Sequence, residues 1–450
     1  MLDDIIKERK KKLDAIIARG LNPYPARVKR THTLREAREN FEAFSSARTS
    51  VSLVGRVVAF RDQGGVVFCD LNDSTDKLQV VLKKEDLKDF DFIVSVLDIG
   101  DFLEVTGMLF ATQRGEQSIA ATNARVIVKS LRPFPTSWSG LKDIEERYRR
   151  RYIDMVLNPE VKEVFLTRSR VVQEIRTLLL NEGFIEVETP VLQPIPGGAL
   201  AKPFTTHHNA LDIDLYLRVS PELYLKRCLV GGMNKVFEFA RDFRNEGVDR
   251  DHYPEFTMLE FYSAYQDYEG LMDFTEKMLK PYLPGSWERI RYADTFKKYA
   301  GRDLKDIPNE QIDEVFKKEV RPKIQEPTFV THYPKAISPL SKSVEGDPEL
   351  TERFQVVVEG TEIVNAFSEL NDPVDQRERM EEQERQHRAG NEEASRFDGD
   401  FVEALEYGMP PAAGLGLGID RLVQLMTKSK AIKDTIIFPT MRSRDEGDIE

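Results

Sequence analysis

The segment from residue 236 to 265, VFEFARDFRNEGVDRDHYPEFTMLEFYSAY, constrains the fold of this chain more than any other. Its pattern predicts two β-strands joined by a polar loop, and every second residue of a strand lies on the same face of its sheet. Guanidinium groups bind phosphate and aromatic rings stack on bases, so one face of these strands predicts a nucleotide site. The alternative is a buried ion pair that supports the sheet. The residues that share this face are Glu238, Ala240, Asp242 and Arg244 on the first strand and Phe256, Met258, Glu260 and Tyr262 on the second.

A second segment, PAAGLGLGIDRLVQLMT at residues 411–427, carries glycine at every second position before the start of a helix. The spacing is not GxGxxG, and the chain has no GxxxxGKS or GxxxxGKT sequence, which excludes the Rossmann and P-loop nucleotide sites. A glycine-rich turn from strand to helix would still bring Arg421 onto the second face of a stacked base.

The composition sets limits on class and location. The 450 residues are 40% hydrophobic and 32% charged, as in a soluble protein, and this length predicts about two to four domains. No apolar run reaches the ~18 residues that span a bilayer, and the N-terminus lacks the apolar stretch of a signal peptide. We therefore expect a cytoplasmic protein without a membrane partner. Cys69 and Cys228 have no Cys or His at metal spacing, so neither a disulfide nor a zinc site is predicted.

Between Val51 and Val128 the sequence predicts five short strands separated by turn residues. Strands this short and this closely spaced favour an OB-fold barrel, which presents an open face to single-stranded nucleic acid. On that face Phe68 would stack on a base and Gln79 would hydrogen-bond to one, or alternatively Phe68 belongs to the core. An amphipathic helix precedes the barrel, with basic residues from position 7 to 12 that either contact RNA or only keep the chain soluble. The net charge of -12 means that any RNA contact has to be local.

Three separated segments resemble the signature motifs of class II aminoacyl-tRNA synthetases. GFIEVETPVLQPIPGGALAKPF at 183–204 is similar to motif 1, FRNEG with HYPEFTMLEFY to motif 2, and GLGLGIDR to motif 3. RVSPELYLKR and NAFSELNDPVDQ, behind an N-terminal OB domain, resemble the lysine members of the subgroup that also contains the aspartate and asparagine enzymes. The resemblance covers nearly the whole chain.

The resemblance implies an α+β fold in three parts. Residues 1–138 would form an N-terminal helix and an OB-fold anticodon-binding domain, and residues 139–160 a linker. Residues 161–450 would form the catalytic domain, an antiparallel sheet flanked by helices. The implied activity is ATP-dependent formation of lysyl-adenylate, followed by transfer of lysine to the 3' end of tRNA(Lys). The implied assembly is a homodimer built around motif 1, and the implied cofactor is Mg²⁺.

The resemblance also assigns roles to residues of the ATP site. Arg244 would contact the α-phosphate and the carboxylate of lysine, and Glu246 would accept the adenine amine. His252 would bind the distal phosphates, while Phe256 and Arg421 would cover the two faces of adenine. Arg244 and Arg421 would be the catalytic residues, because the reaction brings two anions together and needs their charge neutralised.

Further roles concern lysine and the anticodon. Glu222 with Gly198 would bind the α-ammonium group, Asn365 the carboxylate, and Glu369 with Tyr262 the ε-ammonium group. A buried carboxylate facing a cationic chain rejects neutral analogues, which would leave it unpaired. In the barrel, Phe68, Gln79 and, more weakly, Glu116 would contact the anticodon.

This chain departs from the family pattern at the metal site. Glu362 is one expected ligand and Glu369 a further candidate, but Gln355 stands where the family usually has an acidic residue. An amide still offers an oxygen but lacks the charge that a hard cation prefers. An odd number of positions separates Glu362 from Glu369, so one regular strand cannot point both side chains into the site. A bulge or bend is therefore predicted near Ala366, a position where glycine is usual.

Two departures lie in the motif 2 loop, Asp251 beside His252 and Tyr253 where asparagine is common, and each would lower ATP affinity. Two alternative functions follow from the sequence. One is a relative that modifies a protein lysine, although such relatives lack the barrel. The other is an inactive nucleic-acid-binding regulator, which the presence of Arg244, Glu246 and Arg421 argues against.

Overall fold

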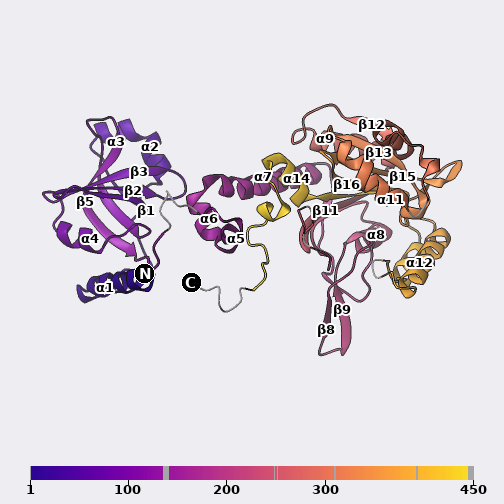
Figure 1. Ribbon diagram of the computed structural model, residues 1–450, viewed down its shortest axis with the longest axis horizontal. Coiled ribbons are helices and arrows are strands. Elements are labelled where there is room, and N and C mark those ends of the chain that lie inside the picture. Colours follow the sequence, from indigo (N-terminus) through magenta and orange to yellow (C-terminus); the bar gives the residue numbers. More distant parts are fainter. Residues whose placement is uncertain are drawn as a thin grey trace. The chain divides into compact units, whose positions relative to one another are not determined.

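The computed structural model describes residues 2–134, 141–247, 249–250, 252–308, 311–391 and 394–443. The chain divides into two compact units, Met1–Lys142 and Asp143–Glu450, each of which Figure 1 shows with its own helices and strands. The predicted border between residues 138 and 139 lies outside the described residues. Within the described part of the chain, no helix is long and apolar enough to cross a membrane.

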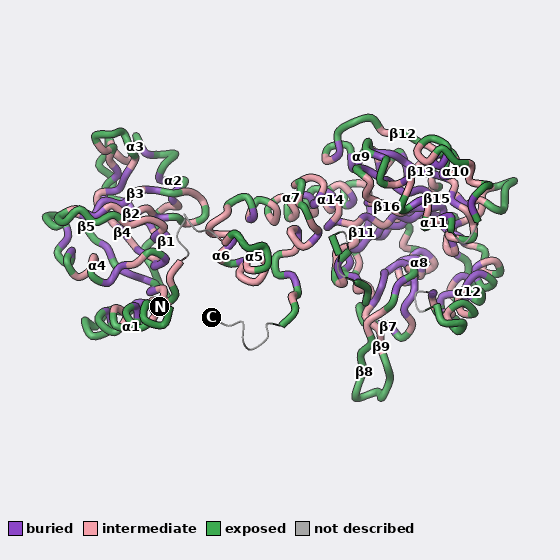
Figure 2. Tube along the Cα trace, viewed as in Figure 1, coloured by how far each residue is buried: buried purple, intermediate pink, exposed green. Residues whose placement is uncertain are grey.

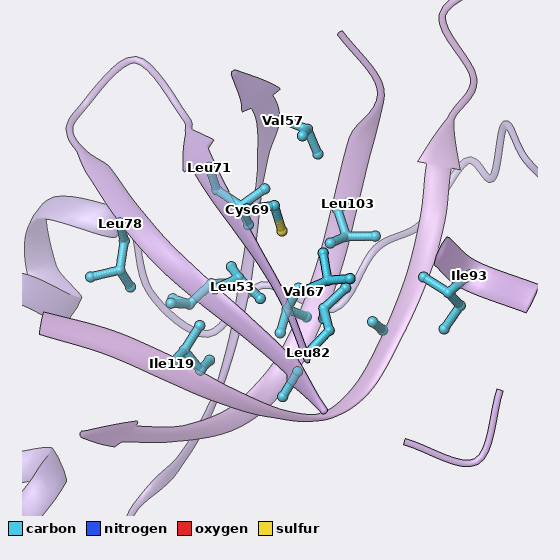
Figure 3. Packing of buried hydrophobic residues seen from close by; sticks show 14 of the residues in the cluster. Leu53, Val57, Val67, Cys69, Leu71, Leu78, Leu82, Ile93, Leu103 and Ile119 are labelled. Carbon is cyan, nitrogen blue, oxygen red and sulfur yellow. The ribbon is translucent and has the colours of Figure 1, made fainter. Parts of the chain in front are cut away.

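The N-terminal unit contains a closed five-stranded barrel with the strand order β1-β2-β3-β5-β4, which confirms the predicted OB-fold. Along each strand alternate side chains point inward, and Figure 3 shows Val67, Cys69 and Leu71 of one strand packed among other buried aliphatic groups. The strands are β1 (Ser50–Asp62), β2 (Val66–Asn72), β3 (Lys77–Lys83), β4 (Phe102–Ala111) and β5 (Gln117–Val128). The helices are α1 (Leu2–Ala18), α2 (Leu34–Glu39), α3 (Phe41–Ser46) and α4 (Phe90–Val96).

Helix α1 is attached to the barrel by a buried arginine. Arg9 is 7% exposed and its guanidinium donates to the carbonyl oxygens of Ile99, Ser130 and Arg132. Arg9 therefore does not belong to the exposed basic face predicted for residues 7–12, and the remaining lysines of that run make up the face.

The second unit is built on a nine-stranded sheet with the order β12-β13-β15-β16-β17-β11-β10-β6, and β14 pairs with β15 at the side. The pairings β12–β13 and β10–β6 are parallel and the others antiparallel, so the sheet is mainly antiparallel as predicted. Its strands are β6 (Ile185–Glu186), β10 (Lys235–Phe243), β11 (Glu255–Ala264), β12 (Glu288–Arg291), β13 (Thr328–Pro334), β14 (Ser343–Val344), β15 (Asp347–Val358), β16 (Thr361–Ser368) and β17 (Ala412–Gly418).

One face of this sheet is covered by helices and the other is left for a site. Leu259, Phe261 and Leu415 point to the covered face and pack in a core with residues of α7, α9 and α14. The intervening residues of the same strands point to the opposite face. The helices of the unit are α5 (Ile144–Arg149), α6 (Arg151–Leu157), α7 (Pro159–Asn181), α8 (Glu222–Val230), α9 (Tyr268–Leu279), α10 (Tyr292–Thr295), α11 (Ile312–Val315), α12 (Pro373–Arg388), α13 (Gly399–Glu406) and α14 (Ile419–Thr427).

A separate three-stranded sheet contains β7 (Leu192–Gln193), β8 (Thr205–His208) and β9 (Ile213–Leu217) in the order β7-β9-β8. The β8–β9 hairpin stands away from the rest of its unit in Figure 1, and Figure 2 shows its tip exposed.

The strands predicted from 236 to 265 are β10 and β11, and their register agrees with the predicted shared face. Glu238 lies opposite Glu260, Ala240 opposite Met258 and Asp242 opposite Phe256. Residues opposite each other in an antiparallel pair point to the same side of the sheet. The two strands therefore present one continuous charged and aromatic surface.

The bulge predicted near Ala366 lies instead at Ile363. Val356 pairs with Val364 and Val357 with Glu362, which leaves Ile363 as the extra residue on β16. Ala366 itself pairs regularly with Phe354 and is fully buried in the helix-covered core. A bulge in this strand was predicted correctly, but its predicted position was wrong. The extra residue turns Glu362 to the same side as Asn365.

Candidate active site

A cavity of about 970 Å³ opens on the uncovered face of the sheet, in the volume range of small-molecule sites. It receives side chains from β11, β15, β16 and β17, from the start of α8 and α14, and from the loops before α8 and after β10. Glu369, in contrast, does not line it. The predicted site residues that line it are Gly198, Glu222, Arg244, Glu246, His252, Phe256, Tyr262, Gln355, Glu362, Asn365 and Arg421.

At one end of the cavity an arginine lies against an aromatic ring. Arg244 follows the last residue of β10, and its backbone N–H donates to the Pro254 carbonyl at 2.9 Å. Its guanidinium lies 4.9 Å from the centre of the Phe256 ring. The buried Nε of Arg244 has no hydrogen-bond partner among the described residues. A buried donor without a partner is costly, so this group is ready to bind an anion.

The same end contains a cluster around Arg421. One guanidinium nitrogen of Arg421 donates to the backbone carbonyl of Glu362 at 2.8 Å, and the other lies 3.4 Å from Nε2 of His252. The opposite ring nitrogen, Nδ1 of His252, lies 2.9 Å from a carboxylate oxygen of Asp249. His252 is thus oriented on one side by a carboxylate, with Nε2 directed toward the arginine. The arrangement brings motif 2 and motif 3 together.

Asp420, beside Arg421, lines the cavity and joins three elements. Its carboxylate accepts from the backbone N–H of Thr257 at 2.7 Å and from Arg168 at 2.6 Å. Residues of α7, β11 and α14 are therefore held by one buried group.

Tyr253 makes a structural contact with the segment that follows α14. It is 7% exposed, and its hydroxyl accepts a hydrogen bond from the Thr440 backbone N–H at 2.5 Å. The tyrosine thus holds the segment that follows α14 against the motif 2 loop. Asp251, the other unusual residue of this loop, lies outside the described residues.

Behind Arg244 lies a buried aspartate. Asp242 is fully buried, its Oδ1 lies 3.4 Å from Nε of Arg218, and neither carboxylate oxygen has a hydrogen-bond partner among the described residues. Burial raises the pKa of Asp242 to about 7, while the charges of Arg244 and Arg218 oppose the rise. This carboxyl is therefore a titratable group beside the guanidinium of Arg244.

The opposite end of the cavity is acidic and largely closed to water. Glu260 is 5% exposed and Tyr262 3% exposed. The Glu260 carboxylate accepts from the hydroxyls of Ser220 and Tyr262 at 2.7 and 2.8 Å. Burial raises the pKa of Glu260 well above its usual value, and the charges of Asp242 and Glu222 act in the same direction. Glu222 lines this end as well.

Gly198 approaches Glu222 so closely that no side chain fits between them. Its φ of +89° is left-handed, and an added Cβ would lie 2.9 Å from the Cβ of Glu222 and from Oγ of Ser220. The backbone at Gly198 and the start of the Glu222 side chain are therefore neighbours.

A buried lysine connects Glu222 with Glu369. Nζ of Lys226 donates to Glu222 at 2.7 Å and lies 2.5 Å from a carboxylate oxygen of Glu369, and both Lys226 and Glu369 are buried. Burial alone would lower the pKa of Lys226, but the charges and hydrogen bonds of Glu222 and Glu369 outweigh it and raise that pKa. Lys226 therefore stays charged and spans the two carboxylates.

Asn365 is oriented by a neighbouring arginine. Nε of Arg353 donates to its side-chain oxygen at 2.8 Å, and the Arg353 guanidinium is held in turn by the Ile337 carbonyl and the Ser338 hydroxyl. With its oxygen engaged, the amide of Asn365 has its NH₂ group left to donate. That polarity suits a carboxylate ligand.

Strand β17 forms the floor between the two ends. Gly414, Gly416 and Gly418 lie opposite Tyr262, Glu260 and Met258 of β11, so all three point to the cavity. An added Cβ at Gly414 would collide with the Tyr262 ring at 2.2 Å and with Oε1 of Glu369 at 2.3 Å. The glycines predicted to form a turn are instead strand residues that leave room on this face.

The acidic donors for a metal are few. Among the described residues, no three His, Cys, Asp or Glu side chains gather in a way that could hold a metal ion. Of the expected pair, the oxygen of Gln355 already accepts from the Tyr333 hydroxyl at 2.8 Å, and the Glu362 carboxylate lies 3.8 Å from Arg321. Glu362 remains as the one charged donor of that pair.

Comparisons with known proteins agree with this geometry. Residues 143–442 match the family model described as tRNA synthetases class II (D, K and N), and residues 51–127 match the OB-fold nucleic acid binding domain. The chain belongs to the class II tRNA synthetases. It is 44% identical to the lysine–tRNA ligase of Pelotomaculum thermopropionicum, over 99% of this chain and 96% of the relative. The lysine–tRNA ligases of Moorella thermoacetica, at 44% over 99% of both chains, and Dehalococcoides mccartyi, at 42% over 98% of both, are similar.

In the barrel of this synthetase, the predicted anticodon residues lie on one outward surface. Phe68 is partly exposed and lies outside the core, opposite Arg61 on β1. The side-chain oxygen of Gln79 accepts from the Ser118 hydroxyl at 3.0 Å, and the same hydroxyl donates to the backbone carbonyl of Glu116. Gln79 and Glu116 are thus joined through one serine.

Three polar residues of the synthetase site were not predicted from the sequence as ligand contacts or positioning groups. Glu260 was placed on the correct face but given no role, and Lys226 and Arg353 were not singled out. The sequence signal for Glu260 was its place between Met258 and Tyr262 on the cavity face. Lys226 and Arg353 gave no such signal, because a lone charge in a helix or strand is usually solvated.

Proposed function

We infer that this synthetase activates L-lysine with ATP to form lysyl-adenylate and then transfers the lysyl group to the 3' end of tRNA(Lys). The observation that carries this inference is the buried acidic end of the cavity, which Glu222 and Glu260 line. Beside it, Glu222 and Glu369 already hold an ammonium group, that of Lys226. A pocket of this charge accepts a cationic amino acid and rejects neutral ones. The names of the similar relatives point to the same substrate.

The first step joins a carboxylate oxygen of lysine to the α-phosphorus of ATP and releases pyrophosphate. Arg244 is proposed to contact both anions, with Asn365 holding the carboxylate through its NH₂ group. Phe256 and Arg421 would enclose the adenine, Glu246 would accept its amine, and His252 would contact the distal phosphates. No strong protein base is required, because lysine enters as a carboxylate and catalysis consists of placing and neutralising two anions.

The amino-acid contacts are proposed to follow the acidic end of the cavity. Glu222 and the Gly198 backbone would bind the α-ammonium group. Glu369 and Tyr262 would bind the ε-ammonium group, with Glu260 holding the Tyr262 hydroxyl in position. In the second step the 3'-hydroxyl of the terminal adenosine attacks the lysyl carbonyl and AMP leaves.

Magnesium is proposed as the cofactor of the first step. Mg²⁺ binds through one or two carboxylates together with substrate phosphates, and Glu362 offers one such carboxylate on the cavity wall. The residues therefore fit one ion shared with the triphosphate, whose positive charge would favour departure of pyrophosphate. Gln355 is a weak ligand at best, since its oxygen is engaged by Tyr333. Glu369 fits poorly because it is buried against Lys226.

A homodimer is proposed on the evidence of an exposed apolar surface. Residues of α7, β6 and β7 expose large aliphatic side chains, which in a monomer would be in contact with water. These are Leu166, Leu180, Ile185, Val191 and Leu192, each 39–50% exposed. Ile185, Val191 and Leu192 belong to the segment that resembles motif 1, where the family forms its dimer, and Leu166 and Leu180 lie on the helix that precedes it. Cytoplasmic location is proposed with the function, since tRNA charging serves translation.

The anticodon is proposed to bind the outward surface of the barrel. Phe68 would stack on one base, and Gln79, with Glu116 as a weaker contact, would hydrogen-bond to others. The partly exposed position of Phe68 and the link from Gln79 to Glu116 through Ser118 support this placement.

The test is ATP–pyrophosphate exchange with lysine, aspartate and asparagine in turn, followed by charging of total tRNA. Exchange with lysine alone and subsequent charging are expected. Exchange with none of the three amino acids would overturn the proposal. Exchange with lysine but no tRNA charging would instead favour the protein-modifying alternative.

A further inference from the structure

Two cations to which the family resemblance assigns no role lie at the cavity wall near Glu362. Lys317 lines the cavity, and Arg321 lies beside the Glu362 carboxylate. They come from the segment that begins with α11 and continues through a π-helical turn at Phe316–Val320 to Arg321. Ile312, Phe316 and Val320 of this segment are buried in a cluster with Tyr292 and Tyr333. The segment is thereby fixed in rotation, with the residues one position later on an adjacent face.

The residues on this adjacent face are Asp313, Lys317 and Arg321. Asp313 and Lys317 line the cavity and form an ion pair at 2.7 Å. Arg321 lies 3.8 Å from the Glu362 carboxylate, which also lines the cavity. The two carboxylates on this wall, Asp313 and Glu362, thus each have a cationic partner from the same segment.

This pairing changes what the wall can bind. Two acidic side chains without counter-ions would attract metal ions and repel the triphosphate. With Lys317 and Arg321 beside them, and with Gln355 neutral, the wall has no excess of negative charge. At 3.8 Å the Arg321–Glu362 contact is longer than a hydrogen bond, and the buried Nε of Arg321 has no partner among the described residues. The guanidinium therefore retains donors for a further anion.

We propose that Lys317 and Arg321 bind the distal phosphates of ATP and take over part of the charge neutralisation that metal ions otherwise provide. The inference rests on the proposed function for the identity of the nucleotide. Arginine is suited to this task because its planar donors match the oxygens of phosphate, while lysine adds a point charge. Arg321 is the principal group and Lys317 the secondary one, since Lys317 is 55% exposed and is shared with Asp313.

The experiment measures ATP and AMP binding by calorimetry in the presence of EDTA, without lysine or tRNA. Wild-type protein is expected to bind ATP without metal. Arg321→Gln should weaken ATP binding by about tenfold or more, because a hydrogen bond to a charged group is lost. Lys317→Gln should have a smaller effect in the same direction. AMP has no distal phosphates, so its affinity should be unchanged in both variants.

Two further variants control for damage to the fold. Lys318→Gln removes a neighbouring lysine that pairs with Glu314 and does not line the cavity, and it should leave ATP affinity unchanged. Arg321→Lys keeps the charge and should restore most of the metal-free ATP affinity. Wild-type ATP affinity in both Arg321→Gln and Lys317→Gln would overturn the proposal. An equal loss of AMP and ATP affinity would overturn it too, because the residues would then support the adenine site.

A second readout counts metal directly. Gln355→Glu combined with Arg321→Gln should increase the number or affinity of Mn²⁺ ions bound with ATP, measured by electron paramagnetic resonance. Equal Mn²⁺ binding in this variant and the wild type would contradict the proposal. Neither experiment depends on which amino acid is activated, so failure of lysine exchange and failure of this inference are distinguishable.

Discussion

The two ends of the cavity in the catalytic unit handle charge in opposite ways. At the acidic end, proposed to bind lysine, Glu222 and Glu260 are buried and pair with Lys226 and with the hydroxyls of Ser220 and Tyr262. Glu369 is buried beside this end against Lys226. At the ATP end, cationic groups line an open wall, and His252 and Lys317 are exposed.

This difference indicates how each end achieves its task. Buried charges are costly unless paired in a fixed geometry, so the end proposed for lysine would reject a neutral amino acid because a buried carboxylate would be left unpaired. Exposed charges are screened by water and salt, so the ATP end has to act through several cations together. Substitutions at the lysine end should therefore have larger effects, and affect stability as well as binding.

Replacing the buried lysine should have the largest effect. Lys226→Met leaves Glu222 and Glu369 without their shared cation, and breaking a buried pair costs about 3–5 kcal/mol. Urea unfolding should show the loss in the free energy of unfolding. Lys280→Met, which removes an exposed lysine paired with Glu276, is the matched control and should change stability by less than about 1 kcal/mol. Equal losses in the two variants would show that the lysine end is not a buried ion-pair network.

A pair of matched carboxylate substitutions should separate the two ends. Glu369→Gln is expected to raise the KM for lysine by about a hundredfold, equivalent to ~3 kcal/mol, and to leave the KM for ATP within a few fold. Glu362→Gln should do the reverse, raising the KM for ATP with little effect on lysine. Pyrophosphate-exchange kinetics at varied lysine and varied ATP supply both values. Equal changes of the KM for lysine and the KM for ATP in both variants would contradict the proposed difference between the two ends of the cavity.

The glycine floor offers a test of packing at the lysine end. In Gly414→Ala the new methyl group would overlap Tyr262 and Glu369, and such overpacking costs about 1–3 kcal/mol. Thermal unfolding should show a lowered midpoint, and lysine affinity should fall. Gly416→Ala, whose added Cβ has no neighbour closer than 3.6 Å, is the control for stability. A Gly414→Ala protein as stable as the Gly416→Ala protein would contradict the predicted collision.

The last prediction concerns the pH dependence of stability that Asp242 causes. Its folded pKa is raised to about 7 from the ordinary 3.8, so the folded state keeps the proton longer than the unfolded state. The stability from this group is therefore complete below pH 4 and is lost as the pH rises toward 7. Asp242→Asn removes this dependence.

Urea unfolding of the wild type and of Asp242→Asn between pH 4 and 8 measures this pH dependence of the free energy of unfolding. The difference between the two proteins should change by about 1.4 kcal/mol per pH unit between pH 4 and pH 7 and then level off. Asp400→Asn, at an exposed aspartate, should show no such trend. A constant difference between wild type and Asp242→Asn across this range would contradict the raised pKa.

The sequence predicted the features that depend on local periodicity or on motifs. The shared face of Glu238, Glu260 and Tyr262 follows from the alternation of strand residues, and the register confirms it. The barrel followed from strand spacing in the same way. The bulge at Ile363 was displaced from its predicted position because the pairing of β16 with β15, which fixes it, is not encoded within β16.

Features that depend on long-range contacts were missed. Lys226 reads as an ordinary helical lysine until α8 and the end of β16 bring Glu222 and Glu369 to it. Arg321 lies in a charged stretch typical of a solvated helix, and only the tertiary fold places it beside Glu362. Tyr253 was predicted to weaken ATP binding, and this stays a prediction; the contact of its hydroxyl with the Thr440 backbone N–H was not predicted. The roles of the individual site residues remain predictions.

The glycines of β17 also limit how this pocket can change. The space above Gly414 is bounded by the ring of Tyr262 and the carboxylate of Glu369, and glycine has no side chain left to remove. Any substitution there can therefore only make the pocket smaller. A variant that accepts a longer or bulkier amino acid would have to gain its room from other residues that line the cavity, by shortening Met380, Phe367 or Leu340.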